Sequence, residues 1–109
     1  MKAAVYRRTS SGKILQISEL GKPAPKDNEV LLKVHAASVN PLDWRLKSAH
    51  PGVDVAGEVE AVGKAVTRFK PGDAVLGLGK GTFAEYACAA EAKLVAKPDN
   101  ITFEQAAAI

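Results

Sequence analysis

Short stretches in which apolar and polar residues alternate run through most of this sequence, and glycine or proline separates one from the next. The stretch DVAGEVEAV at residues 54–62 places Val55, Val59 and Ala61 on the side opposite Glu58 and Glu60. Alternation at a period of two residues is typical of a strand with one buried face. Strands are predicted at residues 2–7, 14–20, 29–39, 53–62, 74–78, 82–90 and 93–98. Many short strands joined by turns indicate a mainly β fold, a barrel or a sandwich.

The connections between these strands carry their own predictions. The first two strands read as a hairpin, and Pro71-Gly72 reads as a turn. Gly57 predicts a bulge or a close backbone approach, and Gly57 and Gly63 are both of the type that permits tight turns. The GLGKG run at residues 77–81 reads as a flexible hairpin loop rather than a phosphate site, because it lacks the Walker spacing and a following helix.

Helix is predicted in only two places. Residues 41–47 favour a short helical turn, with Pro41 at its first position and Asn40 as its cap. A second helix begins near the end of the chain, at TFEQAAAI, where Thr102 is placed to cap it.

Composition narrows the class of protein. A chain of 109 residues suits one domain with a core of its own. The net charge of +3 is small and its basic residues are scattered among acids, which disfavours nucleic-acid binding. No apolar run reaches membrane-spanning length, so no membrane role is expected and the cytoplasm is the default location. Cys88 stands alone, which excludes an internal disulfide, and it reads as a small buried residue.

Motifs that carry chemistry are scarce. The sequence has no G-x-G-x-x-G nucleotide turn, no nucleophile elbow and no His-x-x-x-His pair. What remains is the polar turn Asn40-Pro41-Leu42-Asp43-Trp44, which is the candidate for one wall of a ligand cleft.

One longer pattern is specific. PGVDVAGEVEAVG at residues 51–63 is followed by V-x-x-F-K-P-G-D-x-V, and KPAPKDNEVLLKVHAASVNPLDW precedes it. This order resembles the N-terminal GroES-like domain of the medium-chain dehydrogenase/reductase superfamily, in its zinc-independent quinone oxidoreductase and enoyl reductase-like branch. The resemblance implies a GroES-like, partly open β-barrel over residues 1–109. It also implies that the chain ends where a Rossmann cofactor domain would begin, so that this second domain is missing.

The resemblance also bears on metal binding. Zinc-dependent relatives carry a Cys and a His at the positions that Asn40 and Val53 occupy here. An amide and a valine cannot supply the thiolate and imidazole of a catalytic zinc site. No metal is therefore expected.

The activity that the resemblance implies is hydride transfer from NADPH to a quinone or an enone, a small-molecule substrate. Asn40 matches the position near the nicotinamide and is the expected catalytic residue, with Pro41 and Leu42 beside the cofactor. Trp44 would offer an apolar face to a flat substrate. Two alternatives stay open, since Asn40 could only cap a helix and Trp44 could only pack beneath the turn.

Two connections depart from the family pattern. Relatives have longer segments where this chain has KSAH at residues 47–50 and GKGT at residues 79–82. Without a nucleotide turn the chain alone is expected to be inactive, as a fragment or minimal form of the parent enzyme. The alternative is a stand-alone, non-catalytic GroES-like module that serves as a scaffold or interaction domain.

Overall fold

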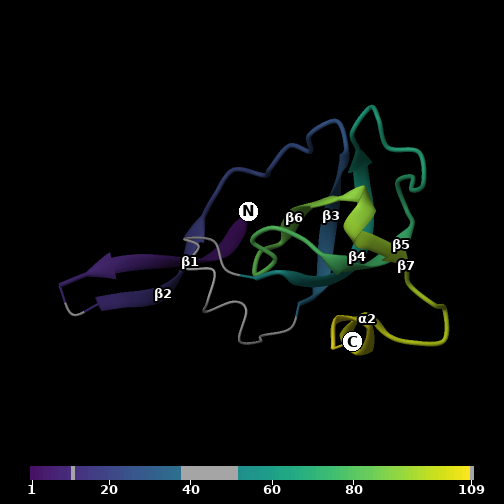
Figure 1. The fold of residues 1–109 in the computed structure, drawn as a ribbon. Coiled ribbons are helices and arrows are strands. Elements are labelled where there is room, and N and C mark those ends of the chain that lie inside the picture. Colours follow the sequence, from purple (N-terminus) through teal and green to yellow (C-terminus); the bar gives the residue numbers. More distant parts are fainter. Residues whose placement is uncertain (11, 38–51, 109) are drawn as a thin grey trace.

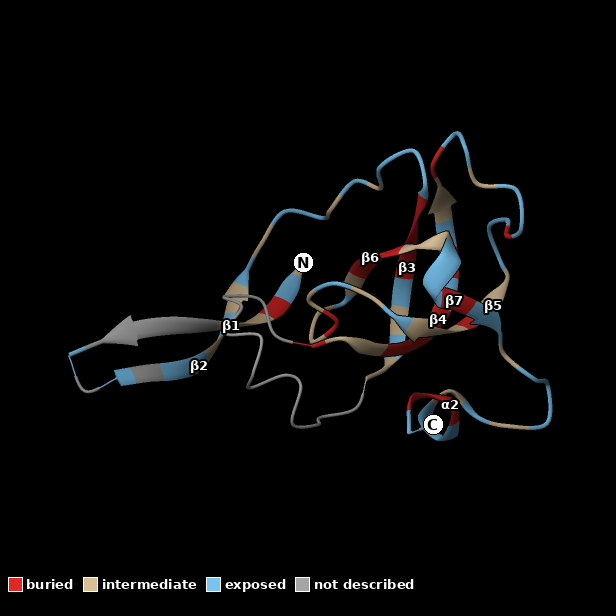
Figure 2. Cartoon of the chain, in the orientation of Figure 1, coloured by how far each residue is buried: buried red, intermediate tan, exposed pale blue. Residues whose placement is uncertain are grey.

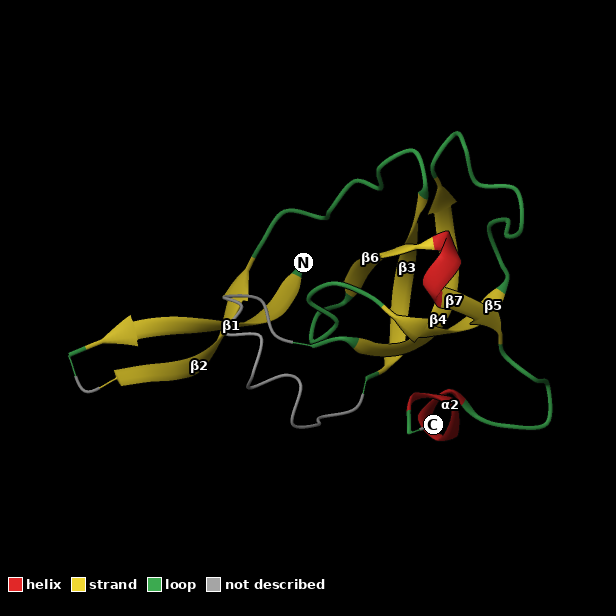
Figure 3. Ribbon diagram, viewed as in Figure 1, coloured by secondary structure: helices red, strands yellow, loops and turns green. Residues whose placement is uncertain are grey.

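The computed structural model describes residues 1–10, 12–37 and 52–108. Its strands in chain order are β1 (Lys2–Thr9), β2 (Gly12–Glu19), β3 (Glu29–Ala36), β4 (Asp54–Val62), β5 (Ala74–Leu78), β6 (Tyr86–Ala90) and β7 (Leu94–Ala96). A 3₁₀ turn, η1 (Glu91–Lys93), precedes β7, and a short helix, α2 (Phe103–Ala107), follows it. The prediction of a mainly β fold is confirmed (Figure 3).

Five of the strands form one antiparallel sheet in the order β6-β3-β4-β5-β7. The strands β1 and β2 form a separate antiparallel hairpin that projects away from this sheet (Figure 1). The base of the hairpin is tied to the segment before β6, where Ala4 N–H donates to the Phe83 carbonyl at 2.7 Å and Ala3 bridges Ala84. In the described part of the chain neither sheet closes on itself, in agreement with a partly open barrel.

The main hydrophobic core lies on the five-stranded sheet (Figure 2). Its buried members come from every strand of that sheet and from the loop after β4: Val30, Leu32, Val55, Val59, Phe69, Val75, Ala89 and Leu94. Leu31 is also buried, with 5% of its surface exposed, although it points to the face opposite Val30 and Leu32. The start of β3 is therefore covered on both faces, which simple alternation does not predict.

The helix α2 covers the other side of the sheet near β4. Its buried residues Ala106 and Ala107 form a small second cluster with Ala56 of β4. Thr102 is the N-cap: its side chain accepts from Gln105 N–H, and the Gln105 side chain accepts from Thr102 N–H in return. The predicted helix start is confirmed, and the reciprocal pair is a complete capping box.

The loop at residues 77–81 corrects the sequence prediction. It does not close a hairpin, because β5 and β6 are not neighbours and β3 and β4 lie between them. This crossover loop instead runs from β5 past β4 and β3 to the β6 edge of the sheet. It is held by Gly79 N–H donating to Val53 O at 2.7 Å and Lys80 N–H donating to Cys88 O at 3.0 Å. Alternation identifies strands but carries no information on which strands pair, so the crossover was not visible in the sequence.

Gly57 and Gly63 both allow a close approach of the backbone. A Cβ on Gly57 would lie less than 3.0 Å from the Lys33 carbonyl oxygen, beside the irregular register between Val34 and Ala36. A Cβ on Gly63 would meet the Lys26 and Asp27 carbonyls just as closely. Neither has a positive φ. The close approach predicted for Gly57 is confirmed. The turn predicted at Gly63 is confirmed too, since Val66 N–H donates to the Gly63 carbonyl at 3.1 Å, whereas Gly57 lies within β4.

Candidate functional site

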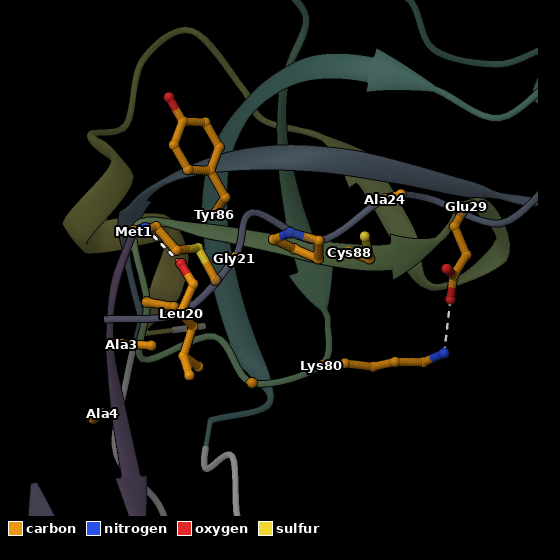
Figure 4. Close-up of a pocket in the computed structure, with 13 residues that line it drawn as sticks. Met1, Ala3, Ala4, Leu20, Gly21, Ala24, Glu29, Lys80, Tyr86 and Cys88 are labelled. Atoms are coloured by element: carbon orange, nitrogen blue, oxygen red, sulfur yellow. Dashed lines mark hydrogen bonds and ion pairs between the residues drawn. The ribbon is translucent and has the colours of Figure 1, made fainter. Parts of the chain in front are cut away.

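A cavity of about 570 Å³ lies between the first residues of β1, the segment that follows β2 and the crossover loop (Figure 4). Its size is within the range of small-molecule sites. Most of the wall is apolar and includes Ala3, Leu20, Pro23 and Ala84. The β3–β6 side of the sheet supplies the rest of the wall through residues such as Cys88.

One end of this cavity carries an ion pair. Lys80 Nζ donates to Glu29 Oε2 at 2.7 Å, and the Lys26 backbone N–H donates to Glu29 Oε1 at 3.0 Å. Only 4% of Glu29 is exposed, whereas the Lys80 side chain is largely in solvent. The hydrogen bond from Lys80, with that from Lys26, lowers the pKa of the Glu29 carboxyl, and the same pairing raises the pKa of Lys80. Both groups are therefore charged at neutral pH.

Cys88 faces the cavity from β6 but is not set up as a nucleophile. It is 7% exposed, and burial raises the pKa of its thiol, with the Glu29 charge adding to the effect. A thiol with a raised pKa stays protonated and reacts slowly. The prediction of a small buried residue is confirmed.

A second polar group lies where β3 meets α2. The His35 and Phe103 rings stack with centroids 4.1 Å apart, and His35 Nε2 lies 3.4 Å from Glu58 Oε1 on β4. Lys97 Nζ lies 5.0 Å from the centre of the Phe103 ring and donates to the Ile101 carbonyl. His35 is exposed, and its ring helps to hold the start of α2 against the sheet.

The residues predicted to form the site, Asn40, Pro41, Leu42 and Trp44, lie outside the described residues. Their roles stay predictions, and so does the short helix expected at residues 41–47. Val53, at the second ligand position of the zinc-dependent relatives, is described. It is half-buried and its carbonyl is engaged by Gly79 N–H.

Among residues 1–10, 12–37 and 52–108 no three His, Cys, Asp or Glu side chains converge to hold a metal ion. Within the same ranges no helix has the length and apolar character needed to cross a bilayer.

The Glu29–Lys80 pair was missed by sequence reasoning. Fifty-one residues separate the two partners, and Lys80 was assigned to a flexible loop. The available signal was Glu29 itself, a charged residue directly in front of the apolar run VLL at a strand start. A carboxylate in that place needs a partner if the strand is buried, but nothing local identifies the partner.

Comparison with known families gives one match that covers most of the chain. The model of the alcohol dehydrogenase GroES-like domain matches residues 26–99. The chain belongs to this family. The β3–β7 sheet and the cavity's Glu29–Lys80 pair both lie within the matched residues.

Several curated relatives of this GroES-like domain are quinone oxidoreductases or their homologs. The quinone oxidoreductase of Sus scrofa is 45% identical over 104 residues, covering 84% of this chain and 32% of the relative. The chloroplastic quinone-oxidoreductase homolog of Spinacia oleracea is 40% identical over 107 residues, covering 84% and 32%. The chain thus spans about a third of the length of the curated relatives it matches.

Solved structures share the fold over the whole chain. Mycobacterial Rv1454c complexed with NADPH superposes with a TM-score of 0.87 at 29% identity, covering 100% of this chain and 37% of that one. A protein from Rhizobium etli classed with zinc-dependent alcohol dehydrogenases gives a TM-score of 0.87 at 37% identity, covering 100% and 36%. The recognised GroES-like domain of the medium-chain dehydrogenase/reductase superfamily is therefore confirmed.

The alignments also show that this chain is shorter than the matching part of a relative. Dehydrogenase pigH of Monascus ruber is 35% identical over 129 aligned positions, covering 97% of this chain and 35% of the relative. Since this chain has 109 residues, at least 20 of those positions fall against gaps in it. Shortened connections in this chain are consistent with this difference.

Proposed function

We propose that this GroES-like domain is the substrate-side part of an oxidoreductase that uses NADPH to reduce quinones or activated carbon–carbon double bonds. The observation that carries the proposal is the 45% identity to a quinone oxidoreductase across most of the chain. The likeness to a structure complexed with NADPH supports the choice of cofactor.

The described residues do not fit the cofactor by themselves. A dinucleotide needs a glycine-rich turn leading into a helix whose N-terminus holds the pyrophosphate. In the described part of the chain the α-helix is α2, which has five residues and follows no such turn. The cofactor would therefore be held by a second, Rossmann domain, for which the greater length of the relatives leaves room.

In that arrangement NADPH supplies the hydride, and this domain supplies the surface that faces the nicotinamide and the substrate. The Asn40 side-chain amide offers both a donor and an acceptor, so it can fix the orientation of the reacting groups. Pro41 and Leu42 would close the wall beside the cofactor and exclude water, and Trp44 would hold the flat face of the substrate. We expect this enzyme to act in the cytoplasm without zinc.

The test uses the protein expressed from its natural gene to its own stop codon. NADPH consumption is followed with a quinone as acceptor. Asn40→Ala should lower the rate by about a hundredfold, because misplaced reactants lose the benefit of orientation. The matched control is Asn28→Ala, at an exposed asparagine in the loop before β3, which should leave the rate unchanged.

Three results would count against the proposal. An Asn40→Ala enzyme with normal turnover would reduce this residue to a helix cap. Quinone-dependent NADPH loss by the 109-residue chain alone would place the active site elsewhere. A gene that stops at residue 109 and whose product does not bind NADPH would favour the non-catalytic scaffold instead.

A further inference from the structure

We propose that the cavity beside Glu29 and Lys80 binds a small, uncharged, mostly apolar molecule that carries a carbonyl group. In the described part of the chain its lining comes from the start of β1, the segment after β2, the crossover loop and the β3–β6 side of the sheet. The proposal does not rest on hydride transfer, because neither NADPH nor Asn40 takes part in it.

The shape of the cavity separates an apolar end from a polar end. The Met1 side chain and Leu20 lie at one end, and the Glu29–Lys80 pair lies at the other (Figure 4). The Met1 ammonium at the first end already donates to the Leu20 carbonyl at 2.6 Å and pairs with Glu19. Between the two ends lies Cys88, a small residue that leaves the volume open (Figure 4). A ligand that fits both ends has an apolar body and one polar group.

Charge decides what that polar group is. The buried Glu29 carboxylate and the Lys80 ammonium are 2.7 Å apart, so their charges cancel at the end of the cavity. A ligand anion on Lys80 would lie beside the Glu29 carboxylate, and a ligand cation on Glu29 would lie beside Lys80. Either ion would be repelled by one member of the pair, which favours a neutral ligand.

Hydrogen-bonding capacity then selects a carbonyl acceptor. The Lys80 ammonium has three N–H donors and gives one of them to Glu29. A ligand carbonyl can accept one of the others without disturbing the ion pair. An acceptor bonded by a charged donor is held more tightly than one bonded by a neutral donor.

The experiment titrates the isotopically labelled 109-residue chain with three probes that share one ring system: 1-indanone, indane and 1-indanecarboxylate. 1-Indanone should shift the amide resonances of Ala84, Tyr86 and Cys88 saturably, and those of α2 should stay fixed. Indane, which lacks the acceptor, should bind about tenfold more weakly. 1-Indanone should also slow the alkylation of Cys88, the only cysteine of the chain.

Two kinds of variant locate the ligand. Ala24→Leu places a larger side chain at the rim of the cavity in an exposed loop, and it should abolish 1-indanone binding. The matched control Ala92→Leu, at an exposed position away from the lining, should not. Lys80→Met should remove the preference for 1-indanone over indane, whereas Lys80→Arg should keep it. This preference is a ratio within one variant, so it remains informative if Lys80→Met weakens the fold.

Several outcomes would overturn the proposal. Binding of 1-indanone that survives Ala24→Leu, or that shifts residues outside the cavity, would place the ligand elsewhere. Equal affinity for indane and 1-indanone would remove the role of Lys80. Tighter binding of 1-indanecarboxylate would show that the ion pair does not act as a neutral unit. Each of these failures leaves the proposed hydride transfer unaffected.

Discussion

Replacing Thr82 by valine is expected to stabilise the domain, although Thr82 is one of its most deeply buried residues. Only 1% of Thr82 is exposed, and its Oγ1 has no hydrogen-bond partner among the described residues. The side chain sits against the Gly52 backbone, where Thr82 N–H donates to the Gly52 carbonyl at 3.1 Å. The Thr82 N–H is thus satisfied, whereas within residues 1–10, 12–37 and 52–108 the hydroxyl is not.

The expected magnitude comes from two terms of the same sign. A buried polar group without a partner costs about 1–3 kcal/mol, and valine removes it while keeping the branched shape. The methyl group that replaces the hydroxyl adds about 0.8 kcal/mol of burial. Part of this gain is offset because a methyl group is bulkier than a hydroxyl beside Gly52, which leaves an expected stabilisation of about 1–2 kcal/mol.

The assay is urea unfolding of the wild type, Thr82→Val and Thr82→Ser, with the m-value as a check that the transition is unchanged. Serine keeps the hydroxyl and loses the methyl, so Thr82→Ser should be less stable than the wild type by about 1 kcal/mol. The opposite signs of the two variants are the test. A Thr82→Val domain less stable than the wild type would mean that the hydroxyl is satisfied and that the reasoning is wrong.

Three further predictions concern the ion pair, the helix cap and the sheet. Because Lys80 lowers the pKa of the Glu29 carboxyl, the ionised form stabilises the fold above its unfolded pKa of about 4.3. This stabilisation is lost as pH falls through the lowered pKa of the folded state. Glu29→Gln should therefore flatten the acid limb of a curve of unfolding free energy against pH. Thr102→Ala should lower the free energy of unfolding, measured with denaturant, by about 1 kcal/mol, because it removes the capping box. An unchanged free energy of unfolding would mean that α2 is held by packing alone. Gly57→Ala should cost about 2 kcal/mol or more by thermal unfolding, because its Cβ meets a β3 carbonyl, while Gly21→Ala, which meets nothing, should be neutral. Equal effects of the two glycine variants would contradict the close-approach argument.

The strands were predictable because each has a local alternation of apolar and polar residues. The alternation around Val55 and Val59 places both in the core, and the Thr102 cap fixes the start of α2. These features depend on neighbours within a few residues, so a single sequence contains them. The Pro71-Gly72 turn was found in the same way, and the structure closes it with Asp73 N–H donating to Lys70 O at 3.1 Å.

The pairing of the strands and the cavity were not predictable in this way. Lys80 contacts Glu29 only because the crossover loop brings it to the β6 edge of the sheet, and no local pattern encodes that path. Leu31 lies on the face opposite Val30 and Leu32, yet it is buried, because both faces of β3 are covered at that point. The candidate residues Asn40 and Trp44 came from family resemblance alone, which transfers a role but supplies no geometry.

The strand order of the five-stranded sheet has a consequence for how the chain folds as it is made. β3 pairs with β6 in a register that joins Glu29 to Ala90 and Lys33 to Tyr86, so this edge of β3 stays open until residues 86–90 have left the ribosome. Until then Val30, Leu31 and Leu32 form an unprotected apolar strand that other chains can join. Strands that lie far apart in the sequence also pair slowly. Synthesis that stalls between β5 and β6 should therefore yield an aggregation-prone intermediate, and a chaperone that holds the β3 edge would act at that stage.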